Sequence, residues 1–201
     1  MLDTDTKVVS RPAGILQGQR IIVLGACCGF GRAMVRALRA SGARVVAADT
    51  DAQTLRQIEH AVPLTLKEPP EEALRRVGRQ WGEARLDAVL NLMPLRNPAR
   101  IDQNVAILQG IVQGFMPALS AREGQIVTVV ARPEQALDVA TGAMAPALVS
   151  AQAAFAHALR RDGLTLNLIN VGEGAVKPAR TAVVGLLAKS MGTLTGAELR
   201  L

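Results

Sequence analysis

The stretch Gly25-Ala26-Cys27-Cys28-Gly29-Phe30-Gly31 decides the fold of this chain. It follows the apolar run 21–24, which has the length of a short strand, and it leads directly into an amphipathic run over 31–41. Glycines at these positions let the backbone turn sharply and approach a phosphate, and the N–H groups at a helix start favour negative charge. The segment therefore predicts a strand, a phosphate-binding loop and a helix, in that order.

A carboxylate stands at the spacing from this loop that dinucleotide-binding domains use. Asp49 lies eighteen residues past Gly31, at the end of the second predicted strand. An acid at that place accepts hydrogen bonds from the adenosine ribose, and it opposes a 2′-phosphate. The pattern favours NAD over NADP. The alternative is that the glycines only allow the strand and the helix to pack closely, with no nucleotide bound.

Short apolar runs alternate with longer amphipathic runs along the rest of the chain. The apolar runs are unbroken, which is typical of strands buried on both faces. The order predicts an α/β fold, a Rossmann-like doubly wound parallel sheet of about six to seven strands with helices on both faces. Residues 1–19 are interpreted as a loose N-terminal leader, and residues 20–201 as a single domain. The predicted strands are 21–24, 44–48, 62–66, 86–90, 125–130 and 164–169, and the predicted helices are 31–41, 51–60, 70–81, 101–119, 143–161 and 178–190.

The composition narrows the class of protein. The 201 residues are 49% hydrophobic and 20% charged, as in ordinary globular chains. Polar residues interrupt every long uncharged stretch and the first residues are acidic and polar, so we expect no membrane span and a cytoplasmic protein. Adjacent Cys27 and Cys28 exclude a disulfide framework, and the distant His60 and His157 predict no metal site.

The net positive charge of the chain favours anionic partners or ligands but does not identify which. The formal net charge is +6, and the basic residues recur on helix faces, which is typical of solvated surfaces. Three phenylalanines and one tryptophan leave little for base stacking, so we do not expect nucleic-acid binding.

The glycine loop resembles that of the short-chain dehydrogenase/reductase family, and further matches follow in order over 18–199. The run 86–91 resembles the strand that ends in the family's Asn-Asn-Ala-Gly, and Asn104 falls where a helix asparagine of the family lies. Runs 124–130 and 163–167 resemble two later strands, and Thr195-Gly196 resembles a turn near the end. The resemblance implies a dinucleotide site that comprises Gly25, Cys27, Cys28, Gly29, Phe30, Gly31, Asp49 and Asn91.

The catalytic groups that the resemblance would imply are missing. The family uses a Tyr, a Lys four residues later, a Ser and the helix Asn, whereas this chain has no tyrosine at all. If the family's pattern is aligned at Asn167 without a gap, the Tyr and Lys positions are occupied by Thr141 and Ala145. If one gap is allowed, they are occupied by Ala147 and Ala151. Ala131 stands at the Ser position, so Asn104 is the sole remnant.

Other departures point the same way. The run Leu92-Met93-Pro94 replaces Asn-Ala-Gly, Thr65 replaces an Asp that contacts adenine, and the segment after Gly172 is too short for the family's substrate lid. The sequence therefore predicts a catalytically inactive short-chain-dehydrogenase-like protein. It would bind NAD(H) weakly or keep a vestigial site, and act as a structural or regulatory partner subunit.

Two alternatives stay open. The chain could be an NAD(P)-dependent oxidoreductase or a non-redox enzyme with a nonstandard active site, for which Glu173, Lys177 and Asn104 are the available groups. Cys27 and Cys28 could be a redox-sensing pair, although small buriable residues are what the family has there.

The helices predicted over 101–119 and 143–161 carry more small and apolar residues than one sheet-facing stripe needs. In the resembling family these two helices build the dimer interface. We therefore expect a homo-oligomer, or a complex with a related subunit, through this surface. Gly110 and Gly114 lie four residues apart, a spacing that allows close helix approach.

Overall fold

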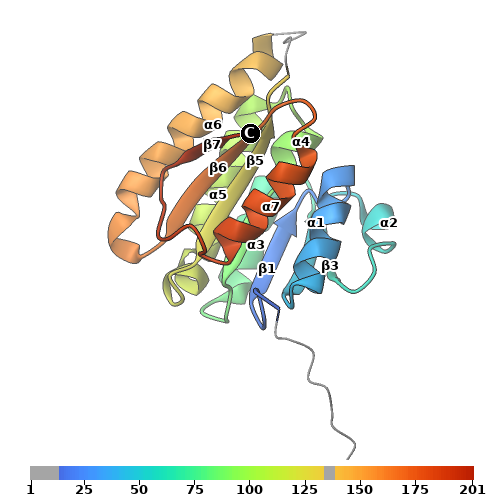
Figure 1. Cartoon of the computed structure of the whole chain (residues 1–201). Helices are drawn as coiled ribbons and strands as arrows, with labels where there is room; N and C mark the ends of the chain where they lie inside the picture. The colour runs from blue at the N-terminus through green and yellow to red at the C-terminus, as the bar shows by residue number, and fades with distance from the viewer. Residues whose placement is uncertain (1–13, 134–138) are drawn as a thin grey trace, which may run out of the picture.

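A computed structural model describes residues 14–133 and 139–201, and they build one parallel sheet with helices on both faces (Figure 1). The strand order is β3-β2-β1-β4-β5-β6-β7, and every neighbouring pair is parallel. The predicted Rossmann-like doubly wound fold is thereby confirmed. The strands are β1 (Arg20–Leu24), β2 (Arg44–Asp49), β3 (Val62–Thr65), β4 (Ala88–Asn91), β5 (Gln125–Ala131), β6 (Thr165–Val171) and β7 (Glu198–Arg200). The helices are α1 (Gly29–Ala40), α2 (Ala52–Leu55), α3 (Pro70–Trp81), α4 (Met93–Arg96), α5 (Ile101–Ser120), α6 (Val139–Ala158) and α7 (Val176–Leu187), with the 3-10 turn η1 (Arg160–Asp162) after α6.

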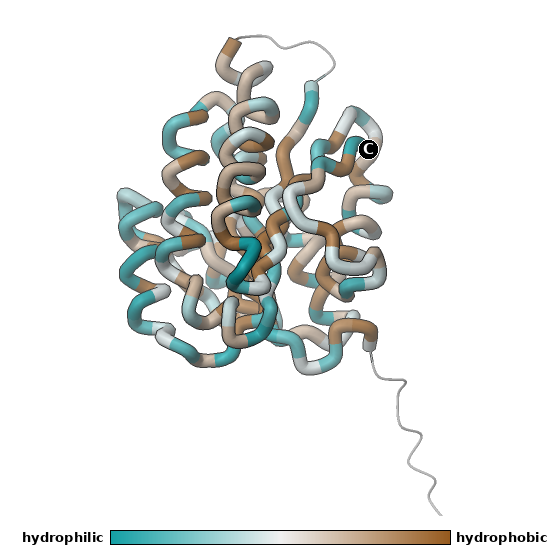
Figure 2. Tube along the Cα trace, turned by 90° about the vertical axis from the view of Figure 1, so that its left-hand side faces the viewer, coloured by the Kyte–Doolittle hydropathy of each residue, from teal (hydrophilic) through white to brown (hydrophobic). Residues whose placement is uncertain are grey.

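The side chains of the central strands alternate between two apolar clusters. In β1, Ile21 and Val23 join the cluster with α1 and α7, whereas Ile22 and Leu24 join the one with α3 and α5. The helices alternate between hydrophobic and hydrophilic segments along their length, as expected when one face of a helix packs on a sheet (Figure 2). The sheet is therefore buried between two helical layers.

Part of the predicted leader packs on the core. Leu16 is fully buried, its N–H donates to Ser41 O at 2.9 Å, and Gly18 N–H donates to Gly42 O at 3.1 Å. Residues 14–19 thus form a turn against the end of α1 rather than a loose segment, and residues 1–13 lie outside the described residues.

Element boundaries differ from the prediction at a few places. The helix predicted over 51–60 ends at Leu55, because the chain continues in turns and His60 takes a left-handed φ of 60° before β3. Helix α6 begins at Val139, four residues before the predicted start. The short α4 and β7 are elements that no predicted range contained.

Helix α6 is long and apolar enough to cross a membrane by length and composition. One such helix is weak support for a membrane protein, because core helices pass the same test. Here α6 contacts β5, β6 and α5, and Met144, Leu148 and Gln152 are buried there. Only 28% of its apolar window is buried within the chain, so packing on the sheet and on α5 accounts for part of its apolar composition.

Candidate functional site

The strand order reverses at β1, which has β2 on one side and β4 on the other. In open α/β sheets, ligands bind in the crevice at the carboxyl ends of the strands where this reversal occurs. The segment 25–31, called the glycine loop below, connects β1 to α1 at this end of the sheet.

The three glycines of the loop have three different roles. Gly25 has a φ of 75°, and a Cβ there would lie 2.8 Å from the Leu92 carbonyl carbon, so the tight turn requires glycine. A Cβ on Gly31 would lie 2.6 Å from Gly25 O, so the helix can pack on the loop only without a side chain. A Cβ on Gly29 would meet nothing within 4 Å, so this residue faces open space. These are the roles of the glycines that let a backbone approach a diphosphate, and the loop fits that group.

Asp49 lies at the predicted place, but its carboxylate is engaged within the chain. Its side chain is fully buried. Oδ2 accepts the Cys27 N–H at 2.9 Å, and Oδ1 accepts the N–H groups of Thr50 at 2.8 Å and Asp51 at 3.4 Å. Arg96 Nη2 of α4 donates to Oδ1 at 3.4 Å. Contact between Asp49 and a ribose stays a prediction, and Arg96 is a residue that sequence reasoning missed.

The two cysteines of the loop are held as thiols. Burial and the neighbouring Asp49 carboxylate raise the pKa of Cys27 to about 12, and burial raises the pKa of Cys28 above its ordinary value. Cys28 caps α1, since its Sγ accepts the Gly31 N–H at 3.2 Å. Because the thiolate is the reactive form, these environments favour a packing and capping role over a redox-sensing pair.

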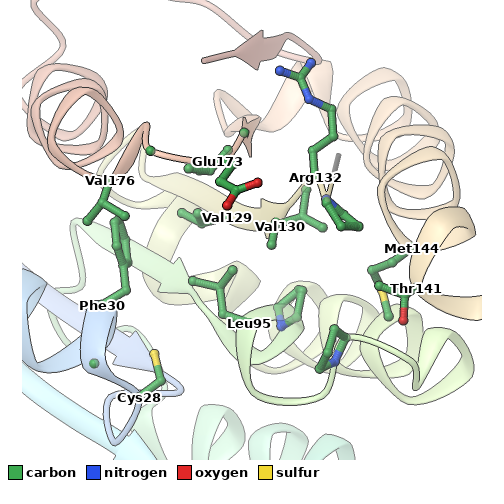
Figure 3. Close-up of a pocket in the computed structure, with 18 residues that line it drawn as sticks. Cys28, Phe30, Leu95, Val129, Val130, Arg132, Thr141, Met144, Glu173 and Val176 are labelled. Atoms are coloured by element: carbon green, nitrogen blue, oxygen red, sulfur yellow. The ribbon is translucent and has the colours of Figure 1, made fainter. Parts of the chain in front are cut away.

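An open cavity of about 890 Å³ extends from the glycine loop across the ends of β5 and β6 (Figure 3). Most of its wall is apolar. Glu173 points into it, whereas the Arg132 guanidinium points away and donates to Leu201 O at 3.4 Å. The lining residues are Cys28, Gly29, Phe30, Pro94, Leu95, Pro98, Val129, Val130, Ala131, Arg132, Pro133, Thr141, Met144, Val171, Gly172, Glu173, Gly174 and Val176.

Solved structures with this architecture cover nearly the whole chain. The match to RhlG of Pseudomonas aeruginosa, solved as an active-site complex with NADP, has a TM-score of 0.80 at 17% identity and covers 96% of this chain and 98% of that one. A citronellol catabolism dehydrogenase of P. aeruginosa PAO1, AtuB, gives 0.79 at 20% identity with 96% of both chains covered. A protein of Burkholderia xenovorans described as a short-chain dehydrogenase/reductase gives 0.77 at 18% identity, with 94% and 96% covered. The chain has the short-chain dehydrogenase/reductase-like fold. No family model and no curated protein matches it in sequence.

Two of the positions expected for catalytic groups of the short-chain dehydrogenase/reductase-like fold lie in the wall of this cavity. Thr141 and Ala131 line the cavity, as the gap-free register expects, whereas Ala147 and Ala151 are not among the described residues that line it. Ala145 is buried in the cluster with Leu148 and does not line the cavity in the described part of the chain. Counting back from Asn167 without a gap therefore agrees better with the residues that line the cavity. This count gives neither a Tyr nor a Lys at the catalytic positions.

The two asparagines of the predicted site are buried beside the cavity. Asn91 accepts the Met93 N–H on Oδ1 at 3.2 Å, while its Nδ2 has no partner among the described residues. Asn104 donates from Nδ2 to the carbonyls of Asn97 at 2.8 Å and Arg100 at 2.9 Å, so it ties the start of α5 to the turn before it. Neither side chain lines the cavity among the described residues, and both act on the backbone around α4.

The glycines of α5 pack within the chain. A Cβ on Gly110 would lie 2.8 Å from Glu71 O, and one on Gly114 would lie 2.7 Å from Leu74 O, so both allow α3 to lie against α5. The close helix approach that their spacing allows is thus made with α3 of the same chain, and an interface with a partner through α5 and α6 stays a prediction. Phe155 on α6 stays partly exposed, so a partner surface can lie only on what α3 leaves uncovered.

Proposed function

We propose that the chain is a dinucleotide-binding protein of short-chain dehydrogenase/reductase-like fold that does not perform the hydride transfer typical of that family. One observation carries the proposal. The chain contains no tyrosine, and the cavity wall where the family's acid would stand has Thr141, Met144 and Ala131 instead. We infer a structural or regulatory role for the subunit.

The glycine loop supports dinucleotide binding. Its middle glycine faces open space, its first-turn N–H groups belong to the 12-residue helix α1, and the cavity begins at the same residues. When bound, a nicotinamide dinucleotide would supply a hydride donor or acceptor. The start of α1 beside Gly29 would hold its diphosphate, and the cavity beside Val129 and Glu173 would be left for the rest of the molecule.

A second candidate function rests on Glu173. Its carboxylate points into the cavity, where it could accept or donate a proton in a nonstandard reaction (Figure 3). The other groups suggested for such a reaction are less suitable, since Asn104 is buried beside α4 and Lys177 does not line the cavity in the described part of the chain.

Thermal unfolding with NAD, NADH, NADP and NADPH tests nucleotide binding. A ligand at about 100 times its Kd adds about 2.7 kcal/mol to the apparent stability, which moves the Tm by several degrees. Gly29→Val should abolish the ligand-induced increase in Tm, because the valine side chain occupies the space through which a diphosphate would reach the loop backbone. The Tm without ligand should stay near wild type, because a Cβ at Gly29 meets no atom within 4 Å. Unchanged nucleotide binding in this variant would contradict the proposed site.

Assays with a panel of ketones, aldehydes and alcohols test the absence of hydride transfer. We expect no turnover above the protein-free background with either dinucleotide. Turnover that Glu173→Gln abolishes, with the nucleotide-induced Tm shift retained, would establish the second candidate and overturn the first.

A further inference from the structure

Arg96 covers the carboxylate that should receive the adenosine ribose. Helix α4 begins two residues after β4 ends, and Asn91 fixes its first turn by accepting the Met93 N–H. Because β1 separates β4 from β2 in the sheet, the Arg96 side chain reaches across the end of β1 to Asp49. The two residues are 47 positions apart in sequence.

Asp49 has little capacity left for a ribose hydroxyl. An ionised carboxylate offers about four lone-pair sites. Two backbone N–H groups and the Arg96 guanidinium already donate to Oδ1, and the Cys27 N–H donates to Oδ2. The Asp49 side chain is 0% exposed, whereas that of Arg96 is 32% exposed. A ligand that reaches this point from solvent therefore meets the guanidinium before the carboxylate.

We propose that Arg96, held in place by Asp49, determines the choice of dinucleotide and that the site takes one with a 2′-phosphate. The inference rests on the proposed function, since it concerns the adenosine end of the same site. An acid at the end of the second strand selects a free 2′-hydroxyl, whereas an arginine nearby accommodates a 2′-phosphate. Here the acid is present, but the arginine lies in front of it.

The electrostatics of the pair agree with this assignment. The Asp49 carboxylate is compensated by one guanidinium and three backbone N–H groups, so its repulsion of a phosphate is reduced. A guanidinium has five N–H donors in a planar fork, and only one nitrogen of Arg96 contacts Asp49 in the described structure. The remaining donors suit a phosphate, and Asp49 acts as the positioning residue that orients them.

Isothermal titration of the full chain with NADP, NAD, adenosine 2′,5′-bisphosphate and adenosine 5′-monophosphate tests the proposal. We expect each 2′-phosphorylated ligand to bind at least about tenfold more tightly than its counterpart, the factor expected for one charge-assisted hydrogen bond. Arg96→Gln should remove that preference and leave NAD affinity unchanged or higher, because it uncovers Asp49. Arg96→Lys should retain part of it.

The matched control is Arg100→Gln, which removes an exposed arginine four residues away that pairs with Asp102 at 3.9 Å. It should leave the preference intact, and circular dichroism and the Tm without ligand should show that all variants are folded. Equal or tighter binding of NAD by the wild type, or equal loss of both dinucleotides in Arg96→Gln, would overturn the role of Arg96 while nucleotide binding itself stands. No binding of any of the four ligands would overturn both the role of Arg96 and the proposed function.

Discussion

Gly78→Ala tests how α3 and α5 hold the second apolar cluster together. A Cβ on Gly78 would lie 2.2 Å from both the carbonyl carbon and oxygen of Gly114, where ordinary contacts begin at 3.4 Å. Both atoms are backbone, so no side chain can rotate away and the helices must separate. Overpacking of this kind costs about 1–3 kcal/mol, and the better helix propensity of alanine returns about 1 kcal/mol. Because the contacts with backbone are so short, we expect a cost of about 3 kcal/mol, and hence a net decrease of about 2 kcal/mol in the free energy of unfolding.

Urea unfolding followed by circular dichroism measures this loss, and the chain supplies a matched control. Gly185 also lies in a helix, α7, but a Cβ there would meet only the ends of the Met191 and Ser190 side chains, at 3.3 and 3.7 Å. Gly185→Ala should therefore be neutral or stabilising by up to about 1 kcal/mol. If Gly78→Ala proves as stable as Gly185→Ala, the reasoning that backbone contact between α3 and α5 sets the helix spacing is refuted.

Of three further predictions, two concern the cysteines and one concerns the surface of α6. Because both thiols have raised pKa values, iodoacetamide at pH 8 should label them more slowly in the folded than in the urea-unfolded chain; equal rates would contradict their protected state. Between pH 9.0 and about 12 an unfolded Cys27 ionises while the native one does not, so wild-type stability should fall more steeply with pH than that of Cys27→Ala. We also expect the chain to self-associate or bind a related subunit through α6, and Phe155→Glu should reduce the mass by light scattering without a change in circular dichroism; a wild-type monomer that recovers no partner from its native extract would contradict this.

The fold was predictable because its signals are local and regular. The glycine loop, the unbroken apolar runs and the helix start at Pro70 all lie within short stretches, and the predicted range 70–81 coincides with α3. By contrast, β7 has three residues, Glu-Leu-Arg, with no periodicity to detect. It forms because its backbone pairs with β6 and because Asn170 donates to the Glu198 carboxylate at 2.8 Å.

The candidate site was predictable in part. Spacing alone located the loop and Asp49, because dinucleotide sites place both at strand ends that the sequence reveals. The contact of Arg96 with Asp49 joins residues 47 apart, one in α4 and one at the end of β2, so no local pattern indicates it. The packing of Gly110 on α3 was likewise not predictable, since a four-residue spacing of glycines indicates that a helix can approach closely but does not identify which helix.

One short segment connects the cavity to the proposed ribose subsite at Asp49. The run Leu92-Met93-Pro94 departs from the family's Asn-Ala-Gly. It supplies the N-cap and the first two residues of the helical turn α4, which ends at Arg96. Pro94 and Leu95 of this turn line the cavity, and Arg96 of the same turn contacts Asp49. Asn91, at the end of the strand that resembles the family's, accepts the Met93 N–H and so helps to position the residues that differ from the family's pattern. On the proposed role of Arg96, cofactor preference and the cavity wall both depend on α4, and we expect a substitution that unwinds α4 to affect both together.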